Sequence, residues 1–202
     1  MFALVESGSI TQMINGNRGI TVDGVQHPRT IFTLWTEAER NAIGIYTVEI
    51  DESKKKNEKW YINTDITYSF DGSKVTGSYG DATAKAHANT LFTAQDETDG
   101  LGTEGDVKVE GLKTQLIRTI KQQAAGILQS TDWYIVRKAD AGTAVPSAIT
   151  THRAAVRTKC AEMETAITNA ADTPALETLY TYTKQEDGSI TRPLGELPVL
   201  EA

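Results

Sequence analysis

The spacing of apolar residues changes near the middle of the chain, and this change constrains the fold more than any other feature. Up to residue 80, short β-prone runs alternate with Gly, Asn and Asp turn signals. From residue 112 onward the spacing is helical instead. Two amphipathic stripes follow, Leu112, Leu116, Ile117, Ile120, Ala124, Ile127 and Leu128, then Ile149, Val156, Cys160, Met163 and Ile167. A β-rich part followed by a helical part predicts an α+β protein.

Turn and capping signals in the first part predict a mostly antiparallel sheet with one short helix. Ser7-Gly8 separates two β-prone runs, which is typical of a hairpin. Thr36 and Glu39 have the spacing of a capping box, so we expect a short helix there that ends at Gly44. Residues 66–70 alternate large and small side chains, as a strand with one buried face does.

Composition predicts where the modules divide. Residues 83–94 are rich in Ala and predict a modest helix at the end of the first module. Residues 96–106 are acidic and Gly-rich, which is typical of an exposed linker. We therefore expect a small antiparallel β-rich N-terminal module at 1–95, the linker at 96–106, and a helical C-terminal module at 107–202 that closes with a β-prone hairpin and tail.

Charge and composition disfavour several classes of partner. A net charge of -7 and a pI near 5.0 oppose nucleic-acid binding, which needs a basic face. No apolar run approaches the roughly 20 residues of a membrane helix, and the first residues do not resemble a signal peptide. Cys160 is the only cysteine, so neither an intrachain disulfide nor a thiolate metal cluster can form. We expect no nucleic acid, no membrane and no cofactor.

Catalytic and metal-binding motifs are missing from the sequence. His27, His87 and His152 are widely separated, and neither H-E-x-x-H nor C-x-x-C occurs. The acidic segment 96–106 invites a calcium interpretation, but an EF-hand loop started at Asp96 fails at its fifth and sixth positions. We therefore predict no catalytic residues, no metal site and no enzymatic activity.

An enzyme or a binding module whose residues meet only in the fold stays open as the alternative. A small glycan-acting hydrolase would need a close pair of carboxylates in a cleft. A sugar- or metal-binding module would use the region of Trp60 and Tyr61.

Residues 130–180 carry a resemblance to a known family. Thr131-Asp132-Trp133 precedes a helix that starts near Pro146 and contains the string His152-Arg153-Ala154-Ala155-Val156-Arg157. This order resembles the C-terminal region of bacteriophage tail assembly chaperone-like proteins, where a Tyr-Arg-x-x-Leu-Arg string closes the pattern. His152 stands in place of the Tyr and Val156 in place of the Leu. Residues 35–46 are also similar to a segment near the start of small phage tail-associated proteins.

The resemblance implies a non-enzymatic protein that acts through protein–protein contacts. Its expected partners are phage tail or tail-fibre proteins, and copies of the chain contacting one another are a further expectation. The expected location is the host cytoplasm during assembly, with the virion tail as the alternative. A transient tail-fibre assembly chaperone and a permanent structural component of the tail or fibre are equally compatible with the sequence.

Four residues are the predicted partner-binding site: Trp133, Tyr134, Arg153 and Arg157. The two arginines share a helix face at i, i+4 spacing, beside the apolar stripe. They either lock Thr131-Asp132-Trp133 against the helix, pair with acidic groups of a partner, or are exposed or helix-capping arginines. The two aromatic residues are either core residues or anchors for a partner. The C-terminal strand and tail complete the predicted contact surface.

Overall fold

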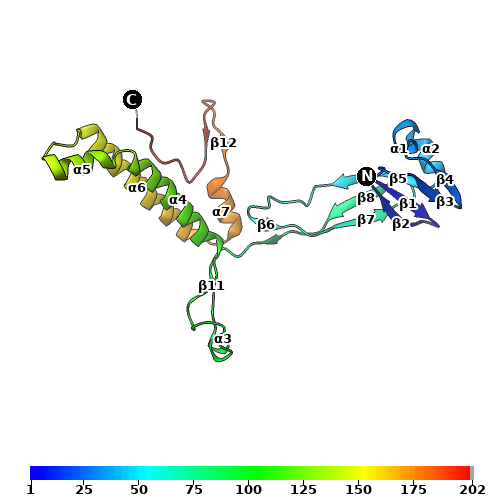
Figure 1. Ribbon diagram of the computed structural model, residues 1–202, viewed down its shortest axis with the longest axis horizontal. Helices are drawn as coiled ribbons and strands as arrows, with labels where there is room; N and C mark the ends of the chain where they lie inside the picture. Colours follow the sequence, from blue (N-terminus) through cyan, green and yellow to red (C-terminus); the bar gives the residue numbers. More distant parts are fainter. Residues whose placement is uncertain (201–202) are drawn as a thin grey trace. The chain divides into compact units, whose positions relative to one another are not determined.

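The computed structural model describes residues 1–200, and it confirms the α+β class, with 37% helix and 24% strand. The chain folds as two compact units, Met1–Thr83 and Ala84–Ala202 (Figure 1). The first unit is rich in strands and the second in helices, as the change in apolar spacing predicted. The division comes before residues 96–106, so the segment predicted to be a linker belongs to the second unit.

The first unit is built on a five-stranded mixed sheet with the strand order β2-β1-β5-β8-β7. All neighbouring strands are antiparallel except β5 and β8, which run parallel. The strands are β1 (Phe2–Glu6), β2 (Ser9–Ile14), β5 (Ile45–Asp51), β7 (Ile66–Phe70) and β8 (Val75–Tyr79).

Both faces of the sheet bury apolar side chains near β1. Successive residues of a strand point to opposite faces, so Leu4 joins one cluster and Ala3 joins another. The cluster around Leu4 is covered by two short elements, the β3–β4 hairpin (Ile20–Val22 and Val25–His27) and α1 (Ile31–Leu34).

The local signals in this unit produce the predicted structures. β1 and β2 form the hairpin, and its turn holds Ser7 and Gly8 at positive φ. Thr36 and Glu39 form the capping box of α2 (Glu37–Ala42). Gly44 then adopts a φ of 79° and β5 follows. β6 (Tyr61–Ile62) and β9 (Thr83–Ala84) are two further short strands.

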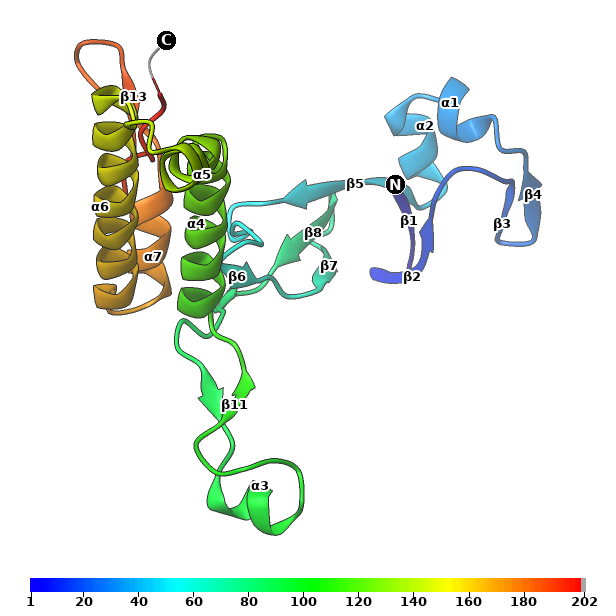
Figure 2. The same ribbon diagram turned by 60° about the vertical axis from the view of Figure 1, so that its left-hand side comes forward.

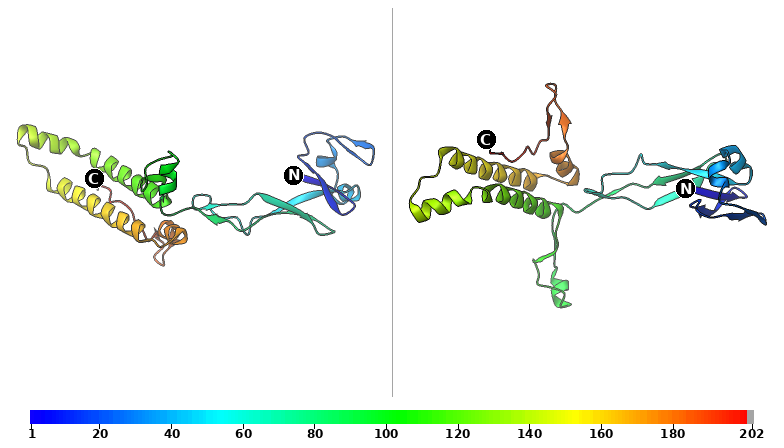
Figure 3. Two further views of the ribbon diagram at one scale, coloured as in Figure 1. Left: turned by 90° about the horizontal axis from the view of Figure 1, so that it is seen from below. Right: turned by 45° about the horizontal axis from the view of Figure 1, so that its top comes forward.

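Four helices make the body of the second unit: α4 (Leu112–Gln129), α5 (Asp132–Ala141), α6 (Ser147–Asn169) and α7 (Thr173–Tyr180). α4 and α6 lie side by side along most of their length (Figure 2). The two views in Figure 3 show the same antiparallel pair, with α5 at its turn end.

The two predicted stripes form the core of this helix pair. Leu116 and Ile120 on α4, and Val156, Met163 and Ile167 on α6, are at most 8% exposed. Polar contacts tie the flanks, since the Lys121 Nζ lies 3.0 Å from Glu164 Oε2. The predicted packing of the two helices is therefore confirmed. Leu176 of α7 and Leu194 extend the buried set.

The predicted helix at 83–94 is wrong, because tertiary hydrogen bonds use this backbone differently. The carbonyls of Ala86 and His87 accept hydrogen bonds from the amides of Leu112 and Lys113. These amides belong to the first turn of α4, which has no partners of its own for them. The Ala-rich segment therefore caps α4 instead of forming a helix.

Residues 90–109 form an ordered excursion ahead of α4. β10 (Thr90–Leu91) pairs with β11 (Val107–Val109), and α3 (Ala94–Thr98) lies between them. At the other end of the unit, the predicted terminal hairpin is present as β12 (Thr183–Lys184) and β13 (Ile190–Thr191).

Candidate protein-contact site

The buried side chain of Arg153 holds the corner between α4 and α5. Its Nη1 atom donates hydrogen bonds to the Leu128 carbonyl at 2.7 Å and to Thr131 Oγ1 at 2.6 Å. Its Nη2 atom lies 2.8 Å from Asp132 Oδ1. The residue is only 7% exposed. One guanidinium thus holds the Leu128 carbonyl together with Thr131 and Asp132, which are two of the three residues in the predicted Thr131-Asp132-Trp133 lock.

The carbonyls at the C-terminal end of α4 explain why this corner forms. The last carbonyls of α4 have no partners within the helix. Arg153 and Thr131 both donate to one of them, the Leu128 carbonyl. Asp132 occupies the first turn of α5, where a carboxylate also interacts favourably with the helix dipole. Arg153 was expected beside the apolar stripe, but the structure places it within the buried face of α6 because these groups neutralise and satisfy it.

Arg157 does not share this role. It is exposed, and its Nη1 atom donates a long hydrogen bond of 3.5 Å to the Arg153 carbonyl. The i, i+4 spacing therefore brings the two arginines near each other without giving them a common partner.

The aromatic pair of the predicted site is on the surface of α5. The rings of Trp133 and Tyr134 stack with centroids 3.8 Å apart, and Trp133 remains 51% exposed. The Arg137 guanidinium carbon lies 4.7 Å from the centre of the Trp133 ring and 5.4 Å from that of Tyr134. The Nε atom of Arg137 is buried and has no hydrogen-bond partner in the described part of the chain. These three residues are called the α5 stack below.

Sequence reasoning missed Arg137, although a signal was present. Arg137 follows Trp133 by four residues and Tyr134 by three, so all three share a side of any helix that includes them. The segment had not been assigned to a helix, and the spacing was therefore not used.

A groove of about 720 Å³ lies beside this corner. One wall comes from α4 and includes Gly126, Ile127 and Ser130, and the floor includes His152 and Met163 of α6. The opposite wall is the C-terminal strap, which we define as residues 192–200. Within the strap, Arg192 pairs with Glu196, whose carboxylate also accepts a hydrogen bond from the Tyr182 hydroxyl at 2.6 Å.

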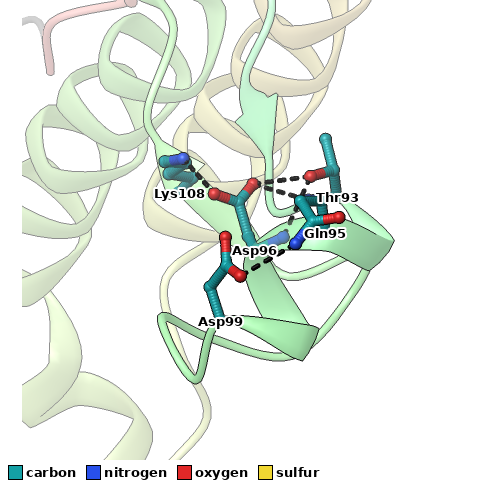
Figure 4. A network of polar contacts seen from close by, with 5 residues as sticks. All are labelled: Thr93, Gln95, Asp96, Asp99 and Lys108. Atoms are coloured by element: carbon teal, nitrogen blue, oxygen red, sulfur yellow. Dashed lines mark hydrogen bonds and ion pairs between the residues drawn. The ribbon is translucent and has the colours of Figure 1, made fainter.

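The acidic segment at 96–106 begins with Asp96, whose carboxylate is engaged by other side chains of the protein (Figure 4). Asp96 accepts hydrogen bonds from Lys108 Nζ at 2.6 Å and from the amide and hydroxyl of Thr93. The Lys108 hydrogen bond is the largest of several effects that lower the pKa of Asp96 from 3.8 to about 2. Within residues 1–200, no three His, Cys, Asp or Glu side chains are grouped as a metal site would require.

Neither the nucleophile candidate Cys160 nor the aromatic pair Trp60 and Tyr61 has the surroundings that its chemistry requires. Burial raises the pKa of the Cys160 thiol, whereas a nucleophilic cysteine needs a lowered pKa. Trp60 and Tyr61 are 3% and 6% exposed, so their rings offer no open platform for stacking on a sugar.

None of the helices in the described residues combines the length and apolar composition needed to cross a bilayer.

Comparison of the chain with protein-family models, with curated proteins and with solved structures found no match.

Proposed function

We propose that this chain is a non-enzymatic bacteriophage tail-associated protein that acts by binding tail or tail-fibre proteins. The observation that carries the proposal is the α5 stack. It places a half-exposed Trp133 against Tyr134 and Arg137. Trp, Tyr and Arg are the residues most enriched at the energetic centres of protein interfaces.

The rigid support beneath the stack favours the same function. The contacts of Arg153 fix the residues immediately before Trp133, so the stack is held ready before a partner arrives. A preorganised surface loses less conformational entropy on binding. The resemblance of residues 130–180 to the tail assembly chaperone-like proteins points to tail proteins as the partners. In this proposal the chain works in the host cytoplasm during assembly or stays in the virion tail.

Co-purification tests the proposal. The tagged chain is mixed with the tail and tail-fibre proteins of its phage, and bound proteins are identified by mass spectrometry. The Trp133→Ser variant should lose the tail protein that the unchanged chain retains. Leu101→Ser is the matched control, because Leu101 is 61% exposed and lies in the excursion before α4. A chain that retains no tail protein, or that turns over a glycan, would contradict the proposal.

A further inference from the structure

The Asn15-Gly16 step lies in the short connection between β2 and β3. Asn15 follows the last residue of β2, and residues 15–19 belong to no helix or strand. Asn15 is exposed, and Gly16 adopts a φ of 71°. Asn15 is also the only Asn of the sequence that is followed by Gly. Asn is among the thermolabile residues of proteins, so this connection is a place to look for covalent change.

An Asn side chain can be attacked by the backbone nitrogen of the residue that follows it. Hydroxide removes the proton of the Gly16 amide, and the nitrogen then forms a bond to Cγ of Asn15. The side-chain nitrogen takes up a proton from water and leaves as ammonia, so that a cyclic succinimide remains. Water opens one or the other ring carbonyl and gives Asp or isoaspartate. Gly favours this attack, because a residue without a Cβ atom leaves the backbone free to bring its nitrogen close to Cγ.

Hydrogen bonding distinguishes Asn15 from other Asn residues of the chain. Within residues 1–200, neither the Asn15 side chain nor the Gly16 amide has a hydrogen-bond partner. The Asn63 side chain, by contrast, is held by the amide and the carbonyl of Lys56, each at 2.8 Å. The Asn89 Oδ1 atom accepts two hydrogen bonds, at 2.9 Å and 2.7 Å. Asn15 can therefore reach the attacking geometry without breaking a contact, whereas these two residues cannot.

Asn17 and Asn169 provide an internal comparison. Both are exposed, and their side chains have no hydrogen-bond partner in the described part of the chain. They precede Arg18 and Ala170, whose Cβ atoms restrict the backbone. The Ala170 amide also donates a hydrogen bond of 3.3 Å to a backbone carbonyl. Exposure alone is thus common to all three Asn residues, and only Asn15 combines it with a following Gly whose amide is unbonded.

We propose that Asn15 is a deamidation site, at which the Gly16 nitrogen forms the succinimide and water releases a mixture of Asp and isoaspartate. Both products carry a carboxylate that is ionised at neutral pH. Each event therefore adds one negative charge to a chain whose net charge is -7. The reaction needs only hydroxide and water, so it proceeds in the isolated protein.

The isoaspartate product should loosen the first unit, because it lengthens the main chain at a packed position. Ile14 is 7% exposed and pairs with Phe2 of β1. A Cβ atom on Gly16 would lie 3.2 Å from the Phe2 ring and 3.3 Å from that of Phe32, so the backbone passes close to both rings. Isoaspartate routes the backbone through its side-chain carbon and inserts one extra atom just before Gly16. The close packing of Gly16 against the two rings is then lost.

Peptide mapping by mass spectrometry tests the proposal on the full chain. The purified protein is incubated in mildly alkaline buffer, and fragmentation spectra locate each conversion and distinguish isoaspartate from Asp. Asn15 should convert at least about ten-fold faster than Asn17 or Asn169, with isoaspartate among the products. Asn15→Gln is the matched variant, because its longer side chain would have to close a larger ring, and position 15 should then stay unmodified.

A second variant separates the added charge from the altered backbone. Asn15→Asp carries the new carboxylate on an ordinary main chain. The isoaspartate form, separated chromatographically after incubation, should melt at a lower temperature than Asn15→Asp. Conversion of Asn15 no faster than that of Asn17, or a product without isoaspartate, would overturn the deamidation site. Equal melting temperatures would overturn the predicted loss of packing at Phe2 and Phe32.

The outcome is independent of the proposed tail function. Asn15 belongs to the first unit, whereas the α5 stack belongs to the second. A stable Asn15 in a chain that co-purifies with a tail protein overturns only the deamidation site.

Discussion

The guanidinium of Arg153 donates a hydrogen bond across 2.6 Å to the hydroxyl of Thr131, 22 residues earlier in the chain. This contact joins α6 to the corner between α4 and α5. The α5 stack begins at that corner. Stability of the corner and presentation of Trp133 are therefore linked through one buried side chain.

Removal of the Arg153 side chain should lower the free energy of unfolding. Arg153→Ala leaves the Thr131 hydroxyl without its donor and opens a cavity under the corner, so we expect a loss of about 2–3 kcal/mol in the free energy of unfolding. Urea denaturation followed by circular dichroism measures it. Arg157→Ala is the matched control on the same helix, and because Arg157 is exposed the expected change is within about 0.5 kcal/mol. Equal losses in the two variants would contradict the assigned role of Arg153.

Presentation of Trp133 should change in the same variant. With the lock removed, α5 is expected to move more freely, and hydrogen exchange of the α5 amides should become faster than in the Arg157→Ala control. Unchanged exchange across α5 in Arg153→Ala would show that the corner is held by other contacts.

The packing of α4 against α6 gives a third prediction. Val156 is fully buried between these helices, so Val156→Asp should destabilise the second unit by at least about 3 kcal/mol. Ala154→Asp is the matched control, since Ala154 lies on the exposed side of α6 and should cost less than about 1 kcal/mol. Thermal melting of both variants decides, and similar melting temperatures would refute this assignment of the core.

The contacts of Asp96 predict a pH dependence in the excursion at 90–109. The folded pKa, about 2, lies below the ordinary value of 3.8, so the ionised carboxylate stabilises the folded segment. This stabilisation is complete above the ordinary value and is lost as the pH falls towards the folded pKa. The amide proton of Thr93, which is bonded to Asp96, should report a titration midpoint near the lower value by NMR.

A matched variant assigns the cause of that shift. Lys108→Met removes the largest contribution to the lowered pKa of Asp96 and should move the midpoint upward, although the Thr93 contacts should keep it below 3.8. A midpoint that stays in place after removal of Lys108 would contradict the ion pair.

The sequence was most informative where structure depends on neighbours in the chain. The stripes containing Leu116 and Val156, and the capping box at Thr36, follow from local spacing alone. The segment 83–94 could not be predicted in this way, because the amides of α4 decide its backbone conformation. α5 was missed because its apolar residues point in several directions and none is buried.

The candidate site was predicted only in part, for the same physical reason. Trp133 and Tyr134 were chosen as an aromatic pair, and the pair does form a stack on the surface. The burial of Arg153 depends on Leu128 and Thr131, more than twenty residues away in the chain. Such a non-local arrangement leaves no periodic signal in the sequence.

Site-specific photo-crosslinking tests the central claim most directly. A benzophenone amino acid is placed at position 133 in one variant and at position 101 in another, where Trp133 is 51% and Leu101 61% exposed. The chain is expressed in cells infected by the phage that, in the proposed function, encodes it. The proposed function predicts that position 133 forms a covalent adduct with a tail or tail-fibre protein and that position 101 does not. Absence of any such adduct at position 133, with the protein folded and abundant, would contradict the account.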